Sequence, residues 1–92
     1  MDTPQSDLTR LSLLVQRILD ADVLGEPEGD SLLVVTEEAR RSLREGDTEA
    51  ARRYVERIAL FTEALIRTEA LDLADGQAVV ETARRILAAN TD

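Results

Sequence analysis

The chain has 92 residues, a formal net charge of −8 and a composition that is 43% hydrophobic but only 2% aromatic. A chain this short buries about 60 to 65% of its unfolded surface, which is enough for a single core built from Leu, Val, Ile and Ala. The acidic balance argues against nucleic-acid binding, which needs clustered cations. No run approaches the roughly 18 apolar residues of a membrane span. The first ten residues have neither the basic region nor the apolar region expected of a signal peptide.

The first amphipathic segment covers about residues 6–22. Its apolar residues repeat at helical spacing and form a stripe wide enough to face a core rather than a two-stranded seam. This stripe consists of Leu8, Leu11, Val15, Ile18 and Leu19. Thr3 precedes Pro4 and is positioned to cap a first turn that begins at the proline.

The second segment is predicted to be helical over about residues 31–45. It follows the sequence LGEPEGDS, whose Gly, Pro and acidic residues are typical of a loop, so an N-cap is expected at Asp30 or Ser31. The apolar stripe of this segment consists of Leu32, Val35, Ala39 and Leu43.

The third segment, about residues 47–69, carries the cleanest stripe, and the fourth covers about residues 74–89. The third stripe consists of Ala51, Tyr54, Ile58, Phe61 and Leu65, widened by Val55 and Thr62. Because Phe61 occupies the middle of this stripe, we expect it at the centre of the core. The fourth stripe consists of Val79, Val80, Ala83, Ile86 and Leu87.

A Gly-Asp pair separates the second and third segments. Gly46 follows a turn that contains arginines, and a glycine there is the usual helix stop because it adopts the left-handed conformation without steric cost. Asp47 can then cap the next helix by accepting a hydrogen bond from a free backbone N–H. So short a connection makes the two helices antiparallel neighbours. The predicted fold is therefore a single all-α domain over residues 1–92, a compact antiparallel four-helix bundle with a tight helical hairpin between helices 2 and 3.

This order of segments resembles the FIMAH domain, a small helical module of secreted bacterial and archaeal hydrolases and surface proteins. The resemblance extends over about residues 8–89 and depends on the spacing A-x-x-x-L-x-x-G-D/N-x-x-x-A. That spacing is matched by Ala39, Leu43, Gly46, Asp47 and Ala51, followed by the apolar positions Val55, Ile58 and Phe61. The resemblance implies a non-catalytic accessory role and transfers no established ligand.

The residue types present also argue against catalysis. The sequence contains no His and no Cys, and all eleven basic residues are arginines. The usual nucleophile–base pairs and Schiff-base chemistry are therefore excluded, and a pair of acids would need a cleft for which a bundle this small has little room. We expect no enzyme activity and no cofactor.

An acidic segment between the first two helices is the strongest candidate for a metal site. DADVLGEPEGDS, residues 20–31, resembles an EF-hand loop at five positions, but Leu24, Pro27 and Ser31 occupy its fifth, eighth and twelfth places. The twelfth place needs a bidentate Glu. The sequence therefore favours a solvated acidic loop over a calcium site, and no metal ligands are expected.

Three apolar residues lie away from the stripes. At 100° per residue, Leu60 points nearly opposite the third stripe, and Leu13 and Val34 lie off the first and second. If they cluster, they form a patch that marks an interface with a protein partner, either another domain of a parent protein or a second copy of the chain.

Two functions remain open at this point. One is an accessory module of the FIMAH type that tethers or spaces a hydrolase or surface protein, which would place the chain outside the cell. The other is a free-standing small acidic helical bundle, acting as a cytoplasmic regulatory or scaffolding protein through protein–protein contact. The sequence alone leaves the compartment unknown.

Overall fold

The computed structural model describes residues 4–89, with side chains described from Asp7 to Ala88. Four helices follow one another: α1 (Pro4–Asp20), α2 (Glu26–Arg44), α3 (Thr48–Arg67) and α4 (Leu73–Ala89). Short connections join them, and no strand occurs in the described range. The predicted all-α class is confirmed. Thr3, expected to cap α1, lies outside the described residues.

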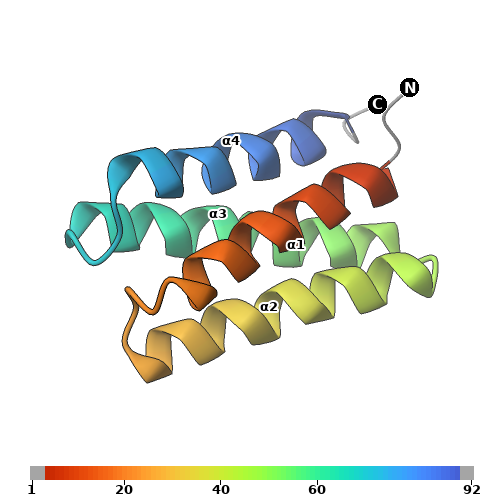
Figure 1. Ribbon diagram of the computed structural model, residues 1–92. Coiled ribbons are helices and arrows are strands. Elements are labelled where there is room, and N and C mark those ends of the chain that lie inside the picture. The colour runs from red at the N-terminus through yellow and green to blue at the C-terminus, as the bar shows by residue number, and fades with distance from the viewer. Residues whose placement is uncertain (1–3, 90–92) are drawn as a thin grey trace.

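The helices form an antiparallel bundle in which each packs against two neighbours (Figure 1). Contacts join α1 to α2, α2 to α3, α3 to α4, and α4 back to α1, whereas the backbones of the diagonal pairs stay more than 8 Å apart between Cα atoms within the described range. The Cα radius of gyration is 12.3 Å, the value of about 12 Å expected for a compact domain of this length. No helix between residues 4 and 89 has both the length and the apolar content needed to span a membrane.

The turn between α2 and α3 has the predicted geometry. Gly46 has φ of +82°, and the N–H groups of Gly46 and Asp47 donate to the carbonyls of Leu43 and Ser42 at 3.1 and 2.9 Å. This pair of bonds is the Schellman pattern, which needs a left-handed residue after the helix. Asp47 then caps α3, since its Oδ1 accepts from the N–H of Ala50 at 3.0 Å.

Helix α2 begins five residues earlier than predicted, so the expected N-cap at Asp30 or Ser31 is wrong. Gly25 is the N-cap and makes no side-chain cap hydrogen bond, and Pro27 lies in the first turn. A proline is tolerated there because the first-turn N–H groups have no intrahelical partner. Glu26 and Glu28 add favourable charge against the positive end of the helix dipole.

The core lies between the four stripes. Its fully buried larger side chains are Leu11, Val15, Leu32, Val55, Ile58, Thr62 and Val79. The prediction that Phe61 lies at the centre is wrong, because Phe61 is only half-buried and packs at the edge of this core, as does Tyr54. Since α3 packs against both α2 and α4, its buried side is turned toward Ala59 and Thr62.

Ion pairs lie on the outside of the bundle. Arg53 pairs with Glu49 at 3.2 Å within α3, as the sequence pattern favours. Glu63 of α3 pairs with Arg84 of α4 at 2.9 Å, so this ion pair joins two helices. Both pairs are solvent-exposed, so each contributes at most about 1 kcal/mol.

Candidate interaction surface

The structure places the three candidate interface residues on three different helices. Leu13, Val34 and Leu60 are 61%, 58% and 57% exposed on α1, α2 and α3. Each faces outward from its own helix, opposite the buried stripe. Helices α1 and α3 are diagonal in the bundle, so Leu13 and Leu60 lie on opposite sides. The structure therefore does not bring the three into a single patch.

Two further exposed apolar residues were not singled out by the sequence. Val23, in the connection after α1, is 53% exposed, and Leu73, the first residue of α4, is 62% exposed. Both lie at the end of the bundle where α1 and α3 finish. The sequence offered a signal for Leu73, because this residue precedes Val79, the first residue of the fourth apolar stripe.

Leu13 lines a recess in the surface. A cleft of about 180 Å³ lies between α1 and α2. Its lining residues are Thr9, Ser12, Leu13, Val15, Gln16, Leu33, Thr36, Glu37 and Arg40. A second hollow along α1, lined by Arg10, Leu14, Arg17 and Asp20, shares Leu13 and Gln16 with the first. Leu13 therefore stands between two adjoining concavities.

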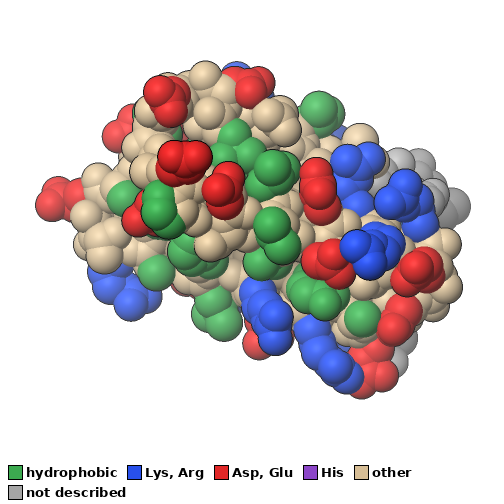
Figure 2. Space-filling view, turned by 90° about the horizontal axis from the view of Figure 1, so that it is seen from below, with side chains coloured by type: hydrophobic (Ala, Val, Ile, Leu, Met, Phe, Trp, Pro, Cys, Tyr) green, Lys and Arg blue, Asp and Glu red, His purple; other side chains and the backbone are tan. Residues whose placement is uncertain are grey.

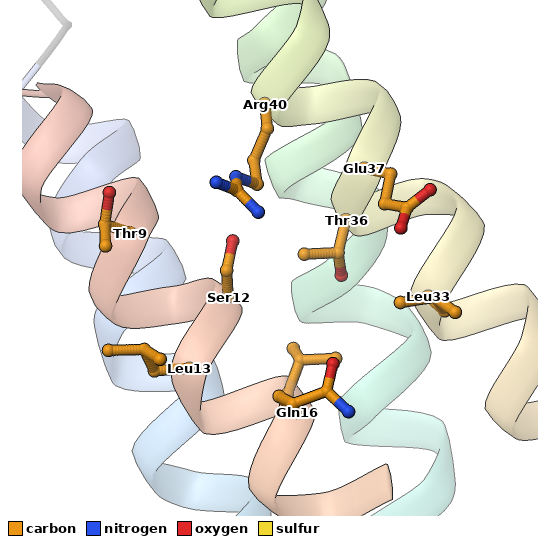
Figure 3. A pocket seen from close by; sticks show the side chains of 9 residues that line it. Thr9, Ser12, Leu13, Gln16, Leu33, Thr36, Glu37 and Arg40 are labelled. Carbon is orange, nitrogen blue, oxygen red and sulfur yellow. The ribbon is translucent and has the colours of Figure 1, made fainter.

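Two of the hydroxyl groups in this cleft, those of Ser12 and Thr36, donate hydrogen bonds to the backbone. Ser12 Oγ donates to the carbonyl of Leu8 at 3.0 Å, and Thr36 Oγ1 donates to the carbonyl of Leu32 at 2.7 Å. Arg40 reaches from α2 into the space between the helices, toward Ser12 (Figure 3). With their hydroxyl protons donated to backbone carbonyls, Ser12 and Thr36 are not paired with a general base that would make them nucleophiles.

Charge is unevenly distributed over the same face. Residues 18–39 contain seven acids and no arginine, whereas Arg40, Arg41 and Arg44 follow in the last turns of α2. Figure 2 views the molecule from below relative to Figure 1, toward the side where α2 lies, and shows this distribution of charge. Acidic side chains predominate at the end near the α1–α2 connection, apolar side chains gather across the middle, and arginines stand toward the other end among glutamates.

The acidic segment at residues 20–31 is not one loop. Its second half, from Glu26, belongs to helix α2, and only residues 21–25 connect the helices. Asp22 takes a left-handed conformation with φ of 55° at the end of α1. Within the described range, no group of three or more Asp or Glu side chains is arranged to hold a metal ion.

Comparison of the chain with protein-family models, with curated proteins and with solved structures gave no match. The function is therefore argued from the surface itself.

Proposed function

We propose that this chain is a non-catalytic interaction module that acts through protein–protein contact. One observation carries the proposal: large apolar side chains stand exposed on helices whose inward faces already fill a complete core. A single exposed Leu is ordinary. Here Leu13 stands between two adjoining concavities that also contain Leu33 and Leu14, and apolar side chains gathered on one exposed face mark an interaction site.

The accessory role implied by the FIMAH resemblance is the form of this function that we favour. A small rigid bundle holds a surface at a fixed distance from its attachment point, which is what tethering or spacing a hydrolase or a surface protein requires. The alternative is the free-standing regulatory or scaffolding bundle, which uses the same kind of surface without a covalent neighbour.

The reading frame that encodes the chain separates these two forms. A signal sequence and a hydrolase domain in the same frame are the expected finding. In that parent protein, deletion of the module should leave turnover of a soluble substrate unchanged and lower activity on a surface-bound substrate several-fold. Equal loss on both substrates would contradict an accessory role, and a short autonomous frame would support the alternative.

A further inference from the structure

The exposed side of the α1–α2 pair carries a charge pattern with an internal symmetry. Successive outward positions of α2 along this side are spaced by four and three residues in alternation, as one helix face requires. They are Glu26, Asp30, Leu33, Glu37, Arg40 and Arg44. We call this row the α2 stripe. The first two members are acidic and the last two are basic; between them lie Leu33, which is half-buried, and a third acid, Glu37. All five charged members are exposed.

The charged ends of the α2 stripe are complementary to each other when its direction is reversed, whereas at its middle Leu33 would face Glu37. Glu26 and Arg44 each lie nine residues from position 35, and Asp30 and Arg40 each lie five residues from it. A second α2 stripe laid antiparallel over the first, centred on that position, therefore sets each of these acids against an arginine.

Helix α1 fits the same arrangement. Its row on this side consists of Thr9, Leu13, Gln16 and Asp20. Leu13 is near the middle of the helix, so a two-fold axis that crosses α2 near position 35 also passes close to Leu13. The apolar residues Leu13 and Leu33 line the same cleft and would lie at the centre of the paired face.

The charged members of the α2 stripe are available for a partner. The ion pairs found among the described side chains are Arg41 with Glu38, Arg53 with Glu49, and Arg84 with Glu63. None of them uses Glu26, Asp30, Arg40 or Arg44. An arginine that is exposed and unpaired in one chain gains most from an acid presented by another.

We propose that the α1–α2 face binds a second copy of this chain as an antiparallel two-fold dimer, with Asp30 facing Arg40 and Glu26 facing Arg44 across the interface. The inference rests on the proposed interaction function and names its partner and surface. A C2 interface must be self-complementary, and the charged ends of this face meet that requirement. The molecule measures 34 × 20 × 19 Å along its principal axes of Cα positions, so one whole side of it is on the order of the ~800 Å² per partner that a standard interface buries.

The net charge of −8 per chain opposes association at long range. At physiological salt the Debye length is about 8 Å, so separated charges are screened and the close pairs across the interface decide the outcome. A parallel pairing of the same face would oppose acid to acid and arginine to arginine. Charge therefore selects the antiparallel arrangement.

Sedimentation equilibrium of the full chain tests the proposal through a charge swap. Asp30→Arg and Arg40→Glu should each weaken the dimer by about tenfold or more, because each places like charges opposite one another twice per dimer. The double variant restores opposite charges in reversed polarity and keeps the net charge, so it should return the dissociation constant to within about threefold of the wild type.

A matched control lies on the far side of the bundle. Arg53→Glu on α3 changes the net charge as Arg40→Glu does and should leave the dimer unchanged. Circular dichroism of every variant confirms that α2 is folded. A wild type that stays monomeric at about 500 µM would overturn the inference, and so would a double variant that fails to recover. A monomer that still supports its parent enzyme on a surface-bound substrate would leave the proposed function standing.

Discussion

Thr62 provides a sharp test of the core. Its side chain is fully buried in α3, and its Oγ1 has no hydrogen-bond partner. A buried hydroxyl without a partner has lost its water without compensation, at a cost of about 1 to 3 kcal/mol. Valine has nearly the same shape and replaces the hydroxyl with a methyl group. Thr62→Val should therefore stabilise the protein by about 1 to 2 kcal/mol.

The matched control is Thr36→Val, because Thr36 is also buried but donates to the carbonyl of Leu32 at 2.7 Å. That substitution removes a satisfied hydroxyl and should be neutral or destabilising by up to about 1 kcal/mol. In thermal unfolding followed by circular dichroism, each kcal/mol shifts the midpoint by about 4 to 8 °C in a domain of this size. If the unfolding midpoint of Thr62→Val were at or below that of Thr36→Val, the Thr62 hydroxyl would have to be hydrogen-bonded, and the reasoning would be wrong.

Three further predictions concern packing and helix ends. Ile58→Ala should cost about 2 to 5 kcal/mol and Phe61→Ala clearly less, because Ile58 is fully buried and Phe61 lies at the edge; urea unfolding that ranks them in the reverse order would refute the core assignment. Gly46 and Glu69 both end a helix in the left-handed conformation, so Gly46→Ala should lower the free energy of unfolding by about 1 kcal/mol and Glu69→Gly should raise it by about 0.5 to 1 kcal/mol. Thermal midpoints that move in the same direction for both variants would contradict this. Gly76→Ala should destabilise by about 1 kcal/mol, because its Cβ would lie 2.5 Å from Cγ1 and Cδ1 of Ile66; a raised midpoint, as at an ordinary helical glycine, would mean that Ile66 moves aside freely.

Local signals predicted the α2–α3 turn well, because each of its requirements lies in one residue. Gly46 supplies the left-handed conformation and Asp47 supplies the cap. The start of α2 gave no comparable signal. Gly25 caps it without a side chain, and Pro27 is compatible with both a loop and a first helical turn.

Periodicity predicted which side of each helix is buried, but not the precise direction within it. Helix α3 packs against both α2 and α4, and the positions of these two helices decide which of its side chains are most buried. Those positions are a property of the whole bundle and cannot be read from the α3 segment alone. Phe61 was therefore placed centrally when Thr62 is the more buried residue. Leu13, Val34 and Leu60 were each identified as facing outward, but only the order of helices around the bundle shows that Leu13 and Leu60 face opposite sides.

The α1–α2 face was hidden from the sequence for a related reason. The charges from Glu26 to Arg44 can be seen in the sequence. They identify a candidate interface only when the structure shows that Leu13 and Leu33 line one cleft beside them. That depends on the register between α1 and α2. Gly29 helps to set this register, since a Cβ there would lie 3.3 Å from Cδ2 of Leu19 on α1.

Cross-linking through a single introduced cysteine tests the central claim most directly. The chain contains no Cys, so each variant carries one thiol. Leu13→Cys lies beside the proposed two-fold axis, whereas Leu60→Cys is similarly exposed on the opposite side. With a short bifunctional maleimide, Leu13→Cys should form a covalent dimer, and Leu60→Cys should remain largely monomeric. Efficient cross-linking through Leu60→Cys, with little through Leu13→Cys, would contradict pairing through the α1–α2 face.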